Sequence, residues 1–138
     1  MDQRQIDLVQ STFAQVKPIA DTASQIFYDE LFALDPSLRP LFTSDLTEQR
    51  RKLMTMLGLA VDGLDDWDLA AEVVRGLGAR HAAYGVRPEH FDTVGAALLT
   101  TLSKGLGDAF TPEVEDAWTA CYVLVSGEMK DAMAVGSV

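Results

Sequence analysis

Apolar residues recur at helical spacing along almost the whole chain, and no stretch alternates apolar and polar residues at period two. A strand with one buried face needs that alternation, whereas a helix with one buried face needs apolar residues three and four positions apart. The pattern therefore predicts an all-α protein with about seven helices, one of them very short. With 138 residues the chain is long enough for one domain, residues 1–138, with a sizeable core. Helices of such unequal length favour oblique crossings over an up-down four-helix bundle.

Capping residues predict where the helices begin and end. Asp2-x-x-Gln5 is a capping box, and Pro18 interrupts the helix that follows it. Asp35-Pro36 and Thr111-Pro112 each combine an N-cap with proline at the first helical position. We expect a second helix to about Leu34, and its inward face carries Ala20, Ala23, Phe27, Leu31 and Leu34. A short third helix should end near Phe42, and the capping box Asp45-x-x-Glu48 should open a helix at 46–64. The remaining helices are expected at 68–84, 87–106 and 112–133.

Charge and composition exclude several classes of partner. The formal net charge of -10 argues against nucleic acid and against anionic membrane surfaces. No basic, apolar leader follows Met1, and the most apolar run, Leu53 to Val61, is too short to span a bilayer. The single cysteine, Cys121, lies on an apolar stripe and reads as a core residue. One cysteine fits a reducing compartment, so we expect a cytoplasmic protein.

A histidine lies on the apolar face of one predicted helix. The inward stripe of this helix is Ala70, Val74, Leu77, His81 and Tyr84, and Gly85 is its expected C-cap. A neutral imidazole with one nitrogen held by a hydrogen bond can ligate iron through the other. The alternative is a core histidine bonded to a backbone carbonyl. The only other histidine, His90, follows Pro88-Glu89 at a helix start and is expected at the surface.

Six motifs, in order, cover essentially the whole chain. They are Phe27-Tyr28-x-x-Leu31-Phe32, Asp35-Pro36-Ser37-Leu38-Arg39-Pro40-Leu41-Phe42, Gln49-Arg50-Arg51-Lys52-Leu53-Met54, residues 78–86, Pro88-Glu89-His90-Phe91-x-x-Val94-Gly95, and residues 106–112 followed by Ala117-Trp118 and Tyr122. Together they resemble the globin family, in particular bacterial single-domain haemoglobins and the globin part of flavohaemoglobins, with similarity to neuroglobins. The resemblance implies a three-over-three globin fold that encloses one haem b between the helices at 46–64 and 68–84.

The resemblance also implies roles for individual residues. His81 matches the proximal histidine that ligates the iron. The residues on the ligand side are matched by Tyr28, Gln49 and Leu53, and the phenylalanine that wedges against the haem is matched by Phe42. The haem propionates could be reached by Arg51 and Lys52. The remaining haem contacts fall on Leu77, Val86 and Phe91. Taken singly, each of these residues could instead be an ordinary core or surface residue.

The ligand side predicts tight dioxygen binding. A tyrosine hydroxyl and a glutamine amide in a dry pocket donate hydrogen bonds to dioxygen, and low dielectric strengthens those bonds. We therefore expect slow release of dioxygen, controlled mainly by Tyr28. Neuroglobins carry a histidine where Gln49 stands, so we expect no bis-histidine coordination here.

Two departures from flavohaemoglobins bear on the function. Phe91 and Met133 stand where those proteins have a tyrosine and a glutamate that hydrogen-bond around the proximal histidine, which puts a strongly activated iron in doubt. The chain also ends at Val138 without a flavin domain, so turnover would need an external flavin-dependent reductase. The leading function is reversible binding of dioxygen, CO and NO. The alternatives are nitric oxide dioxygenation, or a gas sensor or haem-free interaction module, in a monomer or a homodimer.

Overall fold

The computed structural model describes residues 1–42, 46–83, 87 and 89–136, and for residues 78–83 and 133–136 it describes the helical backbone alone. The α-helices of this part of the chain are α1 (Gln3–Val16), α2 (Ala20–Leu34), α3 (Leu46–Asp62), α4 (Trp67–Ala83), α5 (His90–Leu106) and α6 (Pro112–Gly136). Short 3-10 segments, η1 (Lys17–Ile19), η2 (Pro36–Leu41), η3 (Gly63–Asp66) and η4 (Gly107–Ala109), lie between them. The described residues contain no β-strand, which confirms the all-α prediction.

The predicted caps that fall on described residues are confirmed. The Asp2 carboxylate accepts from the Gln5 backbone N–H at 2.8 Å, and the Gln5 side chain accepts from the Asp2 N–H at 3.2 Å. This reciprocal pair satisfies donors at the start of α1 that have no intrahelical partner. At α6 the Thr111 hydroxyl accepts from the Val114 N–H at 3.2 Å. The expected signals at Asp45 and Gly85 lie outside the described residues.

Two details differ from the sequence prediction. The short third helix, η2, is a 3-10 segment, since Pro40 within it has no N–H to donate to an α-helical hydrogen bond. Leu34 was expected to face inward, but 53% of it is exposed. Leu34 is the last residue of α2, and the backbone becomes extended at Asp35, so this position has left the inward stripe.

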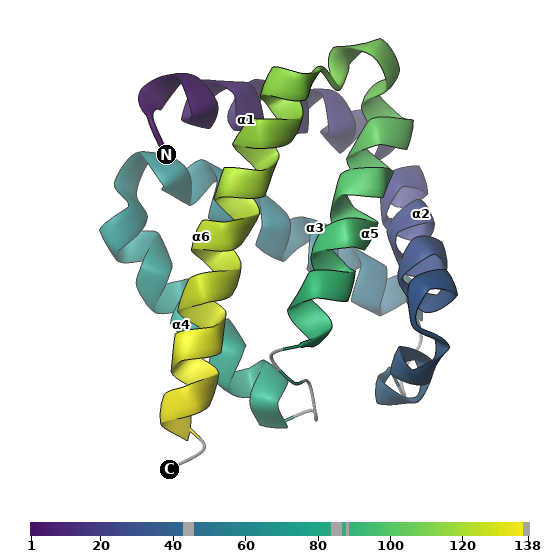
Figure 1. The fold of residues 1–138 in the computed structure, drawn as a ribbon, viewed down its shortest axis with the longest axis vertical. Helices are drawn as coiled ribbons and strands as arrows, with labels where there is room; N and C mark the ends of the chain where they lie inside the picture. Colours follow the sequence, from purple (N-terminus) through teal and green to yellow (C-terminus); the bar gives the residue numbers. More distant parts are fainter. Residues whose placement is uncertain (43–45, 84–86, 88, 137–138) are drawn as a thin grey trace.

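The helices cross one another in a few dominant pairs. The contacts are most extensive between α4 and α6 and between α2 and α5, and α1 crosses over α6. Figure 1 shows α5 and α6 running side by side in front, with α3 crossing behind them. The helix α3 packs on α2 but makes few contacts with α4. No described helix is both long and apolar enough to cross a membrane.

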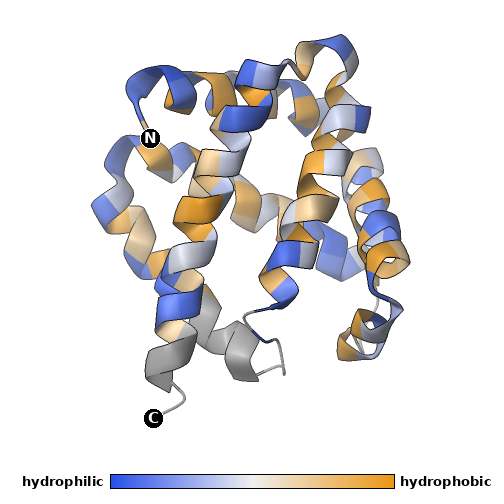
Figure 2. Cartoon of the chain, viewed as in Figure 1, coloured by the Kyte–Doolittle hydropathy of each residue, from blue (hydrophilic) through white to orange (hydrophobic). Residues whose placement is uncertain are grey.

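The main core lies where α1 and α6 meet. Each helix carries an apolar and a polar side (Figure 2), and the apolar side of α6 brings in Trp118, which is fully buried. The Trp118 indole Nε1 donates to the Thr12 hydroxyl at 2.9 Å, and that hydroxyl donates in turn to the Leu8 carbonyl at 2.6 Å. Cys121 is buried beside them as predicted, and burial raises the pKa of its thiol to about 12. Cys121 is therefore a core residue, not a nucleophile.

Candidate functional site

Tyr28 is a buried tyrosine with a polar side-chain partner. Only 4% of the residue is exposed, and its ring lies 5.1, 5.9 and 5.5 Å from the ring centroids of Phe27, Phe32 and Phe42. The Gln49 side chain on α3 lies within hydrogen-bonding reach of the Tyr28 hydroxyl, with the amide as donor, since this contact lowers the pKa of Tyr28. Burial raises the pKa of Tyr28, and the bond to Gln49 lowers it by less. The hydroxyl therefore stays protonated at neutral pH and is available as a donor.

The structure brings the predicted ligand-side residues together. Phe42 follows η2, stacks edge-on against Tyr28 with planes at 78°, and is half-buried. Leu53 lies one turn after Gln49 on α3 and packs against the main core. We call Tyr28, Phe42, Gln49 and Leu53 the Tyr28 cluster. Three separate segments, α2, the residue after η2 and α3, build it, so only the folded chain assembles it.

A second group of buried apolar residues lies where α4, α5 and α6 meet. Val74, Phe91 and Met129, from α4, α5 and α6, are buried together, and Leu77 packs against them. We call these four residues the Phe91 cluster. Leu77 precedes His81 by four residues, one turn of α4. The side chain of His81, like Val86, lies outside the described residues.

Polar groups hold Phe91 in place. The Tyr122 hydroxyl donates to the Phe91 backbone carbonyl at 2.6 Å, and the Lys130 ammonium lies 5.7 Å from the centroid of the Phe91 ring. The pKa of Tyr122 is raised, first by burial and then by the charge of Asp92. Tyr122 is thus a neutral donor tied to the backbone. Sequence reasoning missed this bond, because nothing in the spacing of residues 91 and 122 shows that they meet.

An apolar cavity of about 380 Å³ separates α3 from α4. Its walls are Met56, Leu59, Ala60 and Asp62 from α3, Gly63 and Asp66 from η3, and Leu69, Ala70, Val73, Val74 and Leu77 from α4. Among the residues whose side chains are described, Leu77 is the last of α4 in the lining, and it lies one turn before His81. The chain therefore leaves an apolar space between the two helices, next to a position that carries an imidazole.

The basic residues predicted near the propionates lie on α3. Lys52 is exposed and its ammonium lies 3.9 Å from the Glu48 carboxylate. Arg51 lines a different cavity, between α2 and α3. The role predicted for these two residues stays a prediction. His90 is half-buried at the first position of α5, where its Nδ1 accepts from the Arg87 N–H at 3.0 Å.

Comparison with known families gives a direct result. The family model named Globin matches residues 25–129, more than half of the chain. The chain belongs to the globin family.

Curated relatives of this globin are longer proteins. It is 30% identical over 131 residues to the flavohemoprotein of Bacillus subtilis (strain 168), a match that covers 91% of this chain and 32% of the relative. The flavohemoprotein of Bordetella pertussis is 30% identical over 129 residues, with 91% and 31% covered. The chain thus spans about a third of the length of the curated relatives it matches.

Solved structures show the same fold over nearly the full length. A bacterial globin from Campylobacter jejuni superimposes with a TM-score of 0.85 at 19% identity, covering 97% of both chains. A hexacoordinated heme protein from an anhydrobiotic tardigrade superimposes with a TM-score of 0.88 at 16% identity, covering 97% of this chain and 96% of that one. The predicted globin fold is confirmed.

The described residues of this globin fit a haem. A porphyrin needs apolar walls, and the space between α3 and α4 has them. A hydrogen-bond donor in a dry setting strengthens the binding of a polarised gas ligand, and the buried, protonated Tyr28 hydroxyl is a donor of that kind. Gln49 and Leu53 of the Tyr28 cluster precede Met56 of the cavity lining by seven and three residues, so they lie on the same face of α3 and this helix contributes to both groups.

Proposed function

We propose that this globin holds haem b between α3 and α4 and binds dioxygen reversibly at ferrous iron, with CO and NO as further ligands. The observation that carries the proposal is the buried Tyr28 hydroxyl, whose partner is a side chain from a different helix. A buried hydroxyl of a purely structural tyrosine needs one lasting partner, and a backbone carbonyl serves best. Tyr28 instead faces an amide that can itself donate or accept.

Each residue has a distinct task in this proposal. Haem would supply a ferrous iron that binds diatomic gases, and His81 would hold that iron through a neutral imidazole nitrogen. Tyr28 donates a hydrogen bond to a polarised diatomic ligand, and Gln49 orients the hydroxyl or adds a second donor. Phe42 and Leu53 keep water out of the pocket, so that the hydrogen bonds act at low dielectric. Carbon monoxide is less polarised and gains less from the same donors.

Nitric oxide dioxygenation is a second candidate. The similarity to flavohemoproteins favours it, since the matched third of those proteins aligns with nearly all of this chain. Nitric oxide and dioxygen combine to nitrate, which keeps the nitrogen and all three oxygen atoms, and one electron per turnover would come from a flavin-dependent reductase. The Tyr28 cluster serves this reaction as well, because it holds the same dioxygen molecule.

The absorption spectrum of the purified protein tests the haem proposal. We expect a five-coordinate ferrous spectrum under anaerobic reduction, which converts to stable oxy and carbonmonoxy forms. His81→Ala should lose haem uptake, whereas the matched control His90→Ala should retain it. Haem uptake that is equal in His81→Ala and wild type, or absent from both, would contradict the proposal.

A stopped-flow measurement separates the two candidates. The oxy form is mixed with nitric oxide, with and without a flavin-dependent reductase and its reduced nicotinamide donor. Repeated turnover to nitrate only with reductase supports the dioxygenase. A single slow conversion that the reductase does not renew supports the carrier.

A further inference from the structure

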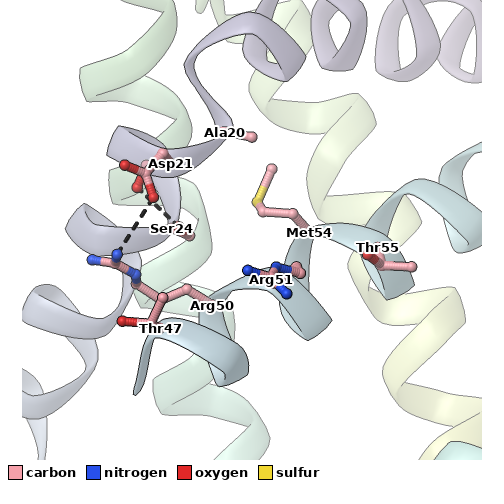
Figure 3. A pocket seen from close by; sticks show the side chains of 8 residues that line it. All are labelled: Ala20, Asp21, Ser24, Thr47, Arg50, Arg51, Met54 and Thr55. Atoms are coloured by element: carbon pink, nitrogen blue, oxygen red, sulfur yellow. Dashed lines mark hydrogen bonds and ion pairs between the residues drawn. The ribbon is translucent and has the colours of Figure 1, made fainter. Parts of the chain in front are cut away.

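A second cavity, of about 360 Å³, lies between α2 and α3. It is lined by Ala20, Asp21 and Ser24 from α2 and by Thr47, Arg50, Arg51, Met54 and Thr55 from α3 (Figure 3). The cavity between α3 and α4 is apolar, whereas this one carries two guanidinium groups, a carboxylate and three hydroxyls. Such a lining suits a small charged ligand.

Arg50 is incompletely satisfied in this cavity. Its side chain is only 22% exposed, and its Nη2 lies 3.4 Å from the Asp21 carboxylate, at the long limit of a hydrogen bond. Its Nε is fully buried and has no hydrogen-bond partner. A buried donor without a partner is costly, and more so when it is charged. The Asp21 side chain, in contrast, is 92% exposed and largely solvated, so it neutralises Arg50 only in part.

Arg51 adds a second positive charge at the same cavity. Among the described residues no ion pair or hydrogen bond is made by its guanidinium, which is exposed. The next residue, Lys52, points elsewhere and pairs with Glu48. In a chain with a formal net charge of -10, two guanidinium groups and one carboxylate in the lining of one cavity form a local excess of positive charge. That excess attracts an anion.

We propose that the cavity between α2 and α3 binds a small inorganic oxyanion of the nitrate or phosphate type. Guanidinium groups present planar forks of N–H donors that match the oxygens of such anions. Arg50, whose Nη2 makes only the long contact to Asp21, and Arg51 would supply these donors, and the exposed Thr55 adds a hydroxyl at the rim. The volume holds an anion together with several waters, since a water occupies about 30 Å³ in the liquid.

The site adjoins the Tyr28 cluster through both of its helices. Ser24 precedes Tyr28 by one turn of α2, and Arg50 directly follows Gln49 on α3. An anion here would therefore lie beside the helices that hold the distal donors. The proposal does not depend on haem, because every residue that carries it belongs to the described part of α2 and α3.

Titration by NMR tests the anion site. The purified protein is titrated with sodium nitrate, and separately with sodium phosphate, at constant ionic strength kept with sodium chloride. If the protein carries haem, it is kept in the ferrous CO form, so that the iron cannot take up the anion. We expect saturable amide shifts confined to residues 20–24 and 47–55. The oxyanion with the lower dissociation constant identifies the preferred source.

Matched variants make the test decisive. Arg51→Gln and Lys52→Gln remove the same charge from neighbouring positions, but only Arg51 lines the cavity. We expect Arg50→Gln and Arg51→Gln to weaken binding about tenfold, the size typical of a lost charge-assisted hydrogen bond, and Lys52→Gln to leave it nearly unchanged. Asp21→Asn removes the competing carboxylate and should tighten binding by about two- to fivefold. Shifts that do not saturate, or equal weakening by Arg51→Gln and Lys52→Gln, would overturn the site and show an adventitious ion only.

Discussion

Tyr28 and Tyr122 are removed from water in the same fold, yet their hydroxyls have different kinds of partner. Burial raises the pKa of both, so both are neutral donors at physiological pH. Tyr122 donates to the backbone carbonyl of Phe91 at 2.6 Å, whereas the side-chain partner of Tyr28 is the amide of Gln49, which donates toward the tyrosine oxygen. A carbonyl fixed in the first turn of a helix cannot leave, but an amide side chain can rotate away. One tyrosine is thus built to hold structure and the other to exchange partners.

The largest expected effect is on the rate of dioxygen dissociation, which should depend on Tyr28 but not on Tyr122. Tyr28→Phe removes the donor that holds a polar ligand, so dioxygen dissociation should accelerate by about tenfold to a hundredfold, the range of a lost hydrogen bond to a charged acceptor. Stopped-flow replacement of dioxygen by CO measures the rate. Tyr122→Phe is the matched control and should change it by less than about threefold. Equal acceleration by both variants would mean that Tyr28 has no special contact with the ligand.

Gly95→Ala should destabilise the packing around Tyr122, because the added methyl group would crowd the Tyr122 ring. A Cβ at Gly95 would lie 2.8 Å from the Tyr122 Cε2 atom, closer than side chains approach one another. The strain should lower the free energy of unfolding by about 1–3 kcal/mol, the usual cost of overpacking. Urea unfolding measures it. Gly127→Ala on α6, where a Cβ meets nothing within 4 Å, should instead be neutral or slightly stabilising.

Tyr122→Phe should destabilise the fold more than Tyr28→Phe does. The change leaves the Phe91 carbonyl without its donor, at a cost of about 1–2 kcal/mol in the free energy of unfolding. At Tyr28 the freed Gln49 amide can turn toward water, so a smaller loss is expected. Urea unfolding of both variants under one set of conditions gives the order. If Tyr28→Phe proved the more destabilising, the contrast between a structural and an exchangeable partner would be wrong.

The smallest effect concerns alkaline pH. The pKa of Cys121 is 9.0 ordinarily and about 12 in the fold, so between these values the unfolded chain loses a proton that the folded chain keeps. Stability is then unaffected below pH 9 and falls as pH rises toward 12. The raised pKa values of Tyr28 and Tyr122 act in the same direction. Cys121→Ala should flatten part of this decline in urea unfolding series at pH 8 and pH 10.5.

Local signals explain how far the sequence predicts the fold. Helix starts at Asp2 and Thr111 depend on residues within one turn, and the structure confirms both. The form of η2 and the exposure of Leu34 depend on how the chain turns between helices, which spacing does not show. The family resemblance supplied the globin fold, since it rests on several motifs in order.

Part of the candidate site could be predicted from the sequence, and part of it depends on contacts that the sequence does not show. The resemblance places Tyr28, Phe42 and Gln49 in one pocket, and the structure brings these three together. The partner of Tyr122 and the cavity around Arg50 escaped the sequence, because they depend on contacts between residues far apart in the chain. The sequence shows that Arg50 and Arg51 are adjacent, but not that the carboxylate of Asp21 lies against Arg50.

The Thr12 hydroxyl has a consequence for the evolution of this chain. It accepts from the Trp118 indole and donates to the Leu8 carbonyl, so one oxygen serves α1 and α6 at once. Valine at position 12 would leave a buried indole N–H unpaired unless residue 118 changed as well, and such neighbours do not contribute additively to stability. Positions 12 and 118 are therefore expected to covary among homologues, with loss of the tryptophan preceding or accompanying loss of the hydroxyl.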